Sequence, residues 1–229
     1  MSDSIPTITL HWLEKSRATR ILWILIYIGL PYEIKTYKRN PNTNRAPPQL
    51  KKIHPLGRSP VITIGDRTLA ESALIVEYLS EHFCSSLIPS KWKTGCEGEI
   101  GGETEEYMRY RHFMHYCEGS LMPLRLLKVR SPNDNKEYLD DCFATHFAFL
   151  EEQLSSAPNG GPYLCGAILT GADFVMSYPV LLVTGGWGNL DVNKARFPKL
   201  FEYAETLKKI ESYRDAEEKV MALEREFSA

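Results

Sequence analysis

The stretch HPLGRSPVI, residues 54–62, is followed a few residues later by AESALIVEYL, residues 70–79. The first stretch has a basic turn, a Ser59-Pro60 bond and a short apolar run typical of a strand. A Gly-Asp pair between the two stretches is a hairpin signal, so PVITI and RTLA are predicted to be neighbouring strands. A helix is predicted over 71–82, because apolar residues recur there at helical spacing.

The segments before this stretch predict a strand, a helix and a second strand. TITLHW, residues 7–12, alternates apolar and polar side chains, as a half-buried strand does. ATRILWILIYIG, residues 18–29, is apolar on nearly every face and is followed by Pro31, which indicates a buried helix. YEIKTY, residues 32–37, reads as the second strand, and a crossover of this length implies that the two strands are parallel.

The chain is expected to have two domains joined by a linker. Residues 1–83 read as a βαβ unit followed by ββα. Residues 84–102 lose the apolar periodicity and contain several glycines, so they are the predicted linker. Residues 103–229 are expected to be entirely helical.

The helical part contains a long amphipathic stretch with a predicted kink at Pro123, where a helix loses a backbone donor. Thr170, followed three residues later by Asp173, has the spacing of a capping box that starts a helix. The other predicted helices span 136–154, 198–209 and 213–227.

The composition excludes several classes of protein. With 229 residues and 43% hydrophobic content, the chain can bury a sizeable core. Lys and Arg total 27 against 29 for Asp and Glu, so the net charge of -2 gives no overall attraction to nucleic acid or an anionic membrane. The longest apolar run, residues 21–30, is about half of the roughly 20 residues that a membrane span needs, and no signal-peptide pattern precedes it. We expect a soluble, cytoplasmic protein.

The cysteines and histidines do not indicate a metal site. The chain has 5 cysteines, an odd number without any CxxC spacing, which argues against a disulfide framework and a zinc knuckle. His112 and His115 lie at i, i+3 on a predicted helix and could present two imidazoles to a metal. No acidic or cysteine partner stands beside them at helical spacing, so ordinary packing is the favoured interpretation and no metal is expected.

A small βαβββα domain followed by an all-helical one resembles the cytosolic glutathione transferase superfamily, with its thioredoxin-like and helical domains. HPLGRSPVI is similar to the family's Asn-Pro-x-Gly-Lys-x-Pro-x-Leu stretch, and AESALIVEYL to its Glu-Ser-x-x-Ile-x-x-Tyr-Leu helix start. LTGADFVMSYPV is similar to its Thr-x-Ala-Asp segment. SRATRILWILIYIGLPYEI and YCEGSLMP resemble a fungal and bacterial branch near the fungal endoplasmic-reticulum-associated type.

The resemblance implies that the Ser59-Pro60 bond is cis. It also implies that the backbone N–H and C=O of Val61 face outward. These groups would pair with the cysteinyl backbone of glutathione, as a sheet edge captures a peptide. Glu71 and Ser72 stand at a helix start, where backbone N–H groups and the dipole attract the γ-glutamyl carboxylate. Glu71 would also meet the γ-glutamyl ammonium. Three side chains are candidates for the glycyl carboxylate: Lys52, His54 and Arg58.

Each of these features has a purely structural interpretation. An X-Pro pair in a turn is usually a trans turn, and Glu-Ser at a helix start usually only caps the helix. Taken together, at this spacing, the glutathione interpretation is favoured. The expected co-substrate is glutathione, without a metal.

The sulfur site is expected in the turn LEKSR, residues 13–17, which has neither Tyr nor Cys. Ser16 is its hydroxyl group and the candidate donor to the thiolate, with Arg17 as an electrostatic aid. A backbone N–H near Lys15 is an alternative donor. As a structural residue, Ser16 would be the N-cap of the first helix.

The electrophile is expected against the long helix that begins near Glu103. Tyr107, Tyr110 and Met114 are the candidate lining for a hydrophobic co-substrate, although aromatic residues at helical spacing more often belong to the core.

We expect an enzyme that conjugates glutathione to hydrophobic electrophiles in detoxification, with glutathione peroxidase activity as a second expected reaction. The alternative is a glutathione-binding regulatory protein that retains the fold without strong catalysis. The resemblance also implies a homodimer. Peripheral association with the endoplasmic reticulum is the alternative to a purely cytoplasmic location.

Overall fold

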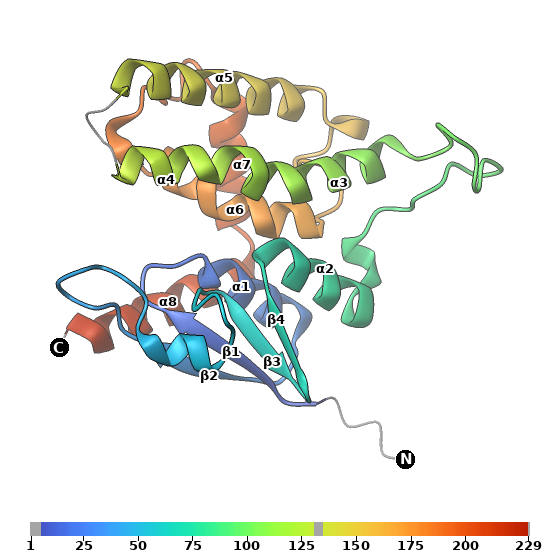
Figure 1. Cartoon of the computed structure of the whole chain (residues 1–229). Helices are drawn as coiled ribbons and strands as arrows, with labels where there is room; N and C mark the ends of the chain where they lie inside the picture. The colour runs from blue at the N-terminus through green and yellow to red at the C-terminus, as the bar shows by residue number, and fades with distance from the viewer. Residues whose placement is uncertain (1–5, 131–134, 229) are drawn as a thin grey trace, which may run out of the picture. The chain divides into compact units, whose positions relative to one another are not determined.

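The computed structural model describes residues 6–130 and 135–228 (Figure 1). By its contacts the chain divides into two compact units. The first comprises the chain up to Cys84 together with the stretch from Lys209 onward, and the second runs from Ser85 to Lys208.

The first unit is built on a four-stranded mixed sheet in the order β2-β1-β3-β4. β1 (Ile8–Leu13) and β2 (Tyr32–Tyr37) are parallel, with Ile8 opposite Tyr32. β3 (Val61–Ile64) is antiparallel to β1 and forms a hairpin with β4 (Arg67–Ala70). The predicted parallel pair and the predicted hairpin are therefore confirmed.

α1 (Ala18–Ile28) is the central helix of this unit, and α2 (Ser72–Phe83) packs beside it. The side chains from Arg20 to Leu25 are all buried, and six consecutive residues point to every side of a helix. The sheet can cover only one side of α1, so another element must cover the rest. α1 ends at Gly29, whose φ of 75° places it in the left-handed region that favours glycine.

α8 (Glu211–Ser228) provides the additional cover for α1 (Figure 1). The indole N–H of Trp23 donates to Ser212 Oγ at 3.1 Å, and the ring of Phe227 is parallel to that of Trp12 at 5.9 Å. By contacts the last helix thus groups with the first unit, whereas the sequence analysis placed it in the helical domain. Ser212 and Phe227 are separated in the chain from Trp23 and Trp12 by 189 and 215 residues, so no local pattern indicates the pairing.

The second unit is helical. After the short 3-10 turn Ser85–Leu87, its helices are α3 (Glu105–Tyr116), α4 (Met122–Arg130), α5 (Lys136–Ser155), α6 (Gly171–Thr184) and α7 (Pro198–Lys208). The fold class expected from the sequence, a thioredoxin-like domain with an all-helical one, is confirmed. Among the described residues, none of the helices is both long and apolar enough to span a membrane.

The predicted kink at Pro123 takes the form of a π-helical turn. α3 and α4 are joined through Cys117–Leu121, which has the wider π-helical hydrogen bonding, and Pro123 follows directly. Proline lacks the N–H that an α-helix would use one turn back, and the wider turn accommodates that loss. The sequence located the interruption but not its geometry.

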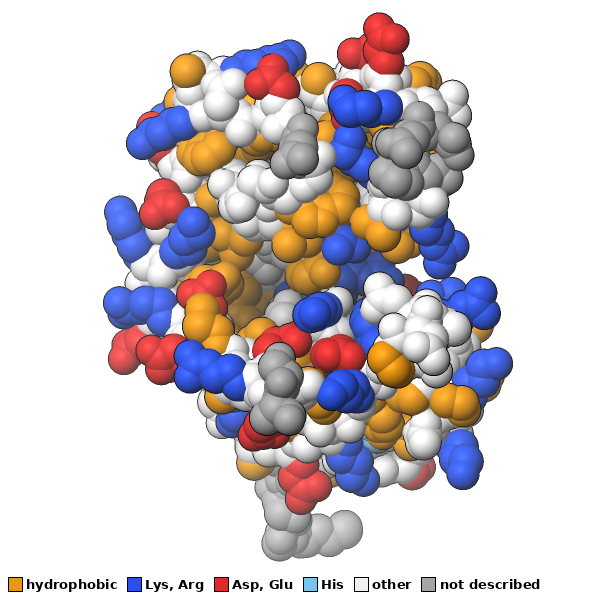
Figure 2. Space-filling model, turned by 90° about the vertical axis from the view of Figure 1, so that its left-hand side faces the viewer, with side chains coloured by type: hydrophobic (Ala, Val, Ile, Leu, Met, Phe, Trp, Pro, Cys, Tyr) orange, Lys and Arg blue, Asp and Glu red, His pale blue; other side chains and the backbone are white. Residues whose placement is uncertain are grey.

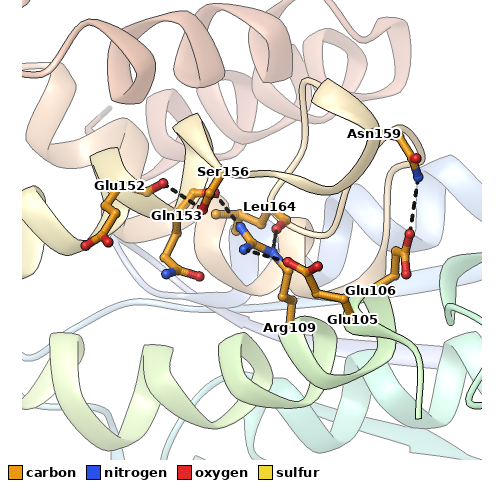
Figure 3. Close-up of polar contacts among 8 residues, drawn as sticks. All are labelled: Glu105, Glu106, Arg109, Glu152, Gln153, Ser156, Asn159 and Leu164. Atoms are coloured by element: carbon orange, nitrogen blue, oxygen red, sulfur yellow. Dashed lines mark hydrogen bonds and ion pairs between the residues drawn. The ribbon is translucent and has the colours of Figure 1, made fainter. Parts of the chain in front are cut away.

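Arg109 joins three segments of the helical unit (Figure 3). Its Nε donates to the carbonyl of Leu164 at 2.8 Å, and Nη2 donates to the carbonyl of Gln153 near the end of α5. Nη1 lies 3.7 Å from Glu105 in the same helix. The buried guanidinium therefore satisfies one backbone carbonyl in the last turn of α5, where intrahelical donors are missing, and one in the segment between α5 and α6.

The predicted capping box at Thr170 is confirmed. The backbone N–H of Thr170 donates to Asp173 Oδ2 at 2.8 Å, and its hydroxyl donates to the same oxygen at 2.9 Å. Asp173 Oδ1 also accepts from the N–H of Leu164 at 3.1 Å and the hydroxyl of Tyr203 at 2.8 Å. Burial raises the pKa of the Asp173 carboxyl, and these four hydrogen bonds oppose the rise.

Candidate active site

Three segments of the first unit meet near the end of β1: the turn after β1, the loop before β3 and the start of α2. Ser59 connects the first two, since its hydroxyl donates to the carbonyl of His11 at 2.9 Å and accepts from the N–H of Leu13 at 3.3 Å. Arg20 connects α1 to α2, because its Nη2 donates to Ser72 Oγ at 2.8 Å. These contacts join Ser59 to the end of β1 and Ser72 to the start of α1 within the first unit.

Ser16 is buried in the turn between β1 and α1. Its Oγ accepts from the backbone N–H of Ala18, the first residue of α1, at 3.2 Å. Ser16 therefore has a structural role at the start of α1, as the alternative interpretation expected. It is not the N-cap itself, because Arg17 is the residue that precedes the first helical residue. Ser16 Oγ lies 3.5 Å from Ser59 Oγ, longer than a good O–H···O bond, so its hydroxyl hydrogen is available to another acceptor.

The backbone amide of Lys15 was the alternative donor to sulfur. Its N–H donates to Glu224 Oε1 in α8 at 2.7 Å, so this amide already has a charged acceptor. A thiolate would have to compete with that carboxylate for the Lys15 N–H. This contact favours Ser16 over the Lys15 amide as the donor, although the role of either group stays a prediction.

The Ser59-Pro60 peptide bond is cis, as the resemblance implied. The expectation that the main chain of Val61 faces outward is wrong, because β3 is an interior strand. Val61 lies opposite His11 of β1 on one side and opposite Ala70 of β4 on the other. Within the described part of the chain, the main chain of Ser59, one residue before the proline, makes no backbone hydrogen bond. It is therefore available for strand-like pairing with a ligand.

The start of α2 has an unusual backbone. Glu71, the residue before the helix, has a φ of 74°, which is rare for a residue with a side chain, and its side chain does not cap the helix. The carboxylate of Glu71 is exposed, whereas Ser72 is buried. Strained backbone of this kind is concentrated at functional sites, where surrounding structure holds it in place.

Arg20 is a residue of this site that the sequence analysis missed. It is 1% exposed, and its guanidinium lies behind the start of α2 against the hydroxyl of Ser72. Arginine is almost never fully buried unless it is paired. The signal was present in the sequence, as a single positive charge inside the apolar run ATRILWILIYIG.

The loop before Ser59 carries the basic candidates. A 3-10 turn, Pro48–Lys52, leads into it. Lys52 and Arg58 are exposed, whereas His54 is half-buried and its Nδ1 accepts from the N–H of Leu56 at 3.4 Å. The two exposed cations are thus free to approach an anionic group in solution.

The candidate lining for an electrophile lies on α3. Tyr110 and Met114 are buried, and only Tyr107 is partly exposed. The rings of Tyr107 and Tyr110 are stacked at 6.3 Å. Burial favours a packing role for Tyr110 and Met114, and leaves Tyr107 as the accessible member of the set.

His112 and His115 take part in no metal cluster among residues 6–130 and 135–228, where no group of three or more His, Cys, Asp or Glu side chains could hold a metal ion. The ring of His112 stacks on Tyr116 at 5.5 Å. Tyr116 in turn shares a hydrogen bond of 2.6 Å with His146 Nδ1. His112 is exposed, and its ring is stacked on an aromatic neighbour of the same helix.

A mixed sheet with this topology, a cis-proline loop before β3 and a separate helical unit define the glutathione transferase fold. Residues 6–81 match the family model "Glutathione S-transferase, N-terminal domain", and residues 123–216 match "Glutathione S-transferase, C-terminal domain". The chain belongs to the glutathione S-transferase family. The second match extends into α8, which shows that the family boundary and the contact boundary differ.

Named relatives support this assignment. Glutathione S-transferase 1 of Saccharomyces cerevisiae is 33% identical over 96% of this chain and 98% of its own length. Glutathione S-transferase 3 of Schizosaccharomyces pombe is 40% identical over 51% of this chain and 43% of its own length. The chain is thus homologous to named glutathione S-transferases, which confirms the expectation of an enzyme of this family.

Solved structures show the same fold. A glutathione S-transferase from Actinobacillus pleuropneumoniae has a TM-score of 0.76 and 31% identity, covering 93% of this chain and 92% of its own. A homologue from Sulfitobacter, solved with bound glutathione, has a TM-score of 0.74 and 18% identity over 94% of this chain and 99% of its own. One from Lodderomyces elongisporus, with two glutathione molecules per subunit, has a TM-score of 0.70 and 18% identity, covering 92% and 97%.

Proposed function

We propose that this protein binds glutathione and transfers its thiolate to hydrophobic electrophiles, with hydroperoxides as a second class of substrate. The observation that carries the proposal is that one unit holds the main chain of Ser59, the hydroxyl of Ser16 and the helix start at Ser72. Ser59 contacts β1 and lies 3.5 Å from Ser16, and Arg20 of α1 contacts Ser72. The glutathione-bound relatives provide the chemical class of the ligand.

The γ-glutamyl end of glutathione would bind at the start of α2. The first backbone N–H groups of a helix and its dipole favour a carboxylate. Ser72 Oγ accepts from Arg20, so its own hydrogen can be donated to that carboxylate, and the buried guanidinium adds positive charge behind it. The exposed carboxylate of Glu71 would receive the ammonium group.

The cysteinyl part would pair with the main chain of Ser59 rather than Val61. A peptide laid beside Ser59 can exchange N–H···O=C bonds in the manner of an added strand. The glycyl carboxylate would then lie toward the basic loop that contains Lys52, His54 and Arg58. This arrangement leaves the cysteinyl sulfur near the turn that carries Ser16.

The chemistry requires glutathione as thiolate. A thiol with a pKa near 8.5 is mostly protonated at neutral pH, and a hydroxyl hydrogen bond to sulfur favours the anion. The thiolate forms a bond to the electrophilic carbon, and a halide leaves with the bonding electron pair. Turnover with an aryl halide and with an organic hydroperoxide tests the proposal, and absence of both activities in glutathione-binding protein would contradict it.

Glu71→Gln is expected to weaken glutathione binding about tenfold, since it removes the charge that meets the ligand ammonium, at a cost of about 1.4 kcal/mol. Isothermal titration calorimetry measures this change. Glu81→Gln, an exposed change near the other end of α2, is the matched control and should leave affinity unaltered. Equal affinities for the two variants would remove Glu71 from the ligand site.

The second candidate is a glutathione-binding regulatory protein with little catalysis. The observation that favours it is the hydrogen bond from Ala18 to Ser16, which gives the hydroxyl oxygen a structural function without any chemistry. Retention on glutathione-agarose, without turnover of halides, isothiocyanates or hydroperoxides, would support this candidate over the enzyme.

We further infer a place in the fungal and bacterial branch, near the fungal endoplasmic-reticulum-associated type. The similarity to the two yeast proteins and to the Actinobacillus structure supports that branch. A role in detoxification, a cytoplasmic location and peripheral association with the endoplasmic reticulum are proposals that cell fractionation and sensitivity of a deletion strain to electrophiles would test.

We also propose that the protein is a homodimer without affinity for nucleic acid. Figure 2 shows basic, acidic and apolar side chains interspersed over one face, so the described residues there form no broad basic surface. Size-exclusion chromatography should give a species near twice the chain mass of 26.1 kDa. A species at the mass of one chain would contradict the dimer.

A further inference from the structure

The turn between β1 and α1, residues 14–17, is held in place by side chains from distant segments. Lys15 has a φ of 49°, in the left-handed region that residues with side chains disfavour. Its N–H donates to Glu224 at 2.7 Å. The carbonyl oxygens of Glu14 and Lys15 accept from Arg39 at 3.1 and 3.4 Å. The conformation of this turn therefore depends on Arg39 and Glu224.

Glu224 reaches the turn because α8 is anchored to the first unit near both of its ends. Near its start, Ser212 accepts from the indole N–H of Trp23 at 3.1 Å. Near its end, Phe227 stacks on Trp12 with an interplanar angle of 2°. Trp12 belongs to β1, directly before the turn, so the anchor and the carboxylate act on the same short segment.

We propose that Glu224 is a positioning residue for Ser16, acting through the backbone amide of Lys15. The proposal rests on the proposed function, in which the hydroxyl of Ser16 stabilises the thiolate. The φ angle of Lys15 determines the direction in which the chain continues to Ser16. A charged acceptor on the Lys15 N–H holds that angle in its disfavoured region and keeps Ser16 Oγ 3.5 Å from Ser59 Oγ.

Glu224 has two opposing effects on the thiolate. As a hydrogen-bond acceptor it holds the turn, which favours the thiolate. As a negative charge held against Lys15, the residue next to Ser16 in the chain, it opposes formation of a second anion nearby. Glutamine retains the acceptor oxygen and loses the charge, whereas alanine loses both. The two variants therefore separate positioning from electrostatics.

The test compares Glu224→Ala and Glu224→Gln with Glu218→Ala, a change of an exposed carboxylate on the same helix. In Glu224→Ala we expect kcat with an aryl halide to fall about tenfold, and the pKa of bound glutathione to rise by about one unit. The KM for glutathione should change less than about twofold, because the carboxylate and main-chain contacts are elsewhere. Glu224→Gln and Glu218→Ala should retain wild-type kcat within about twofold.

Amide hydrogen exchange of residues 13–17 in the ligand-free protein gives a readout that needs no activity. Exchange should be faster in Glu224→Ala and unchanged in Glu218→Ala. Unchanged exchange in Glu224→Ala, or equal loss of kcat in the alanine and glutamine variants, would overturn the proposal. If the wild type binds glutathione without turnover, the proposed function fails. Amide hydrogen exchange of residues 13–17 and the pKa of the bound thiol still decide the role of Glu224 in that case.

Discussion

Replacement of Ser16 by alanine is expected to lower kcat with glutathione and an aryl halide by about 100-fold to 1000-fold, the usual effect of removing one donor to a developing anion. The pKa of bound glutathione should rise toward its value in solution, since the hydroxyl hydrogen is the group available to the sulfur. Steady-state kinetics and a pH titration of the bound thiolate measure the two effects together.

Ser16 also accepts a hydrogen bond from the first amide of α1, so losing this hydrogen bond has a structural cost of about 1 kcal/mol. Ser16→Gly is the companion variant, because it removes the same hydroxyl and tests the donor with a second replacement of the side chain. Ser16→Thr retains the hydroxyl and should recover activity. Wild-type kcat in the glycine variant, with an unaltered thiol pKa, would exclude Ser16 from the mechanism.

Asp173→Ala is expected to reduce the free energy of unfolding by about 3 to 5 kcal/mol, which is a large fraction of the stability of an ordinary domain. Asp173 is completely buried and accepts four hydrogen bonds, from Thr170, Leu164 and Tyr203. Removing the carboxylate leaves all four donors without an acceptor in the interior. Urea denaturation, followed by circular dichroism, measures the loss.

The control for this prediction is Asp191→Ala, which removes an exposed carboxylate that pairs with Arg196 at 3.1 Å. An exposed ion pair contributes about 0 to 1 kcal/mol, so this variant should unfold almost as the wild type does. Asp173→Asn should be destabilised as well, since its amide nitrogen would face donors. A loss below about 1 kcal/mol in Asp173→Ala would show that water replaces the carboxylate in this network.

Local patterns were sufficient for the elements of the fold. Alternation in TITLHW predicted β1, YEIKTY was read as the strand that became β2, and the Gly-Asp pair predicted the hairpin of β3 and β4. Thr170 and Asp173 predicted the start of α6. These signals are reliable because strand pleating, hairpin turns and helix caps each involve residues that lie within a few positions of one another.

The details of the site were less accessible to local patterns. The cis bond at Pro60 followed from resemblance, yet the expectation that the main chain of Val61 faces outward was wrong. Which side of a strand is free depends on its neighbours, and β3 has a neighbour on both sides. That information is absent from the HPLGRSPVI stretch itself.

The sequence by itself determined the order of the elements, because strands, helices and turns depend on short-range periodicity and turn chemistry. Its spaced motifs indicated the class of protein through their resemblance to the glutathione transferases. The tertiary structure alone decided that Arg20 lies behind Ser72, that Val61 is interior and that Glu224 holds the Lys15 amide. Each of these contacts joins side chains or strands that are far apart in the chain. Packing of the sheet and of α8 on α1 brings them together, and no local pattern encodes such a meeting.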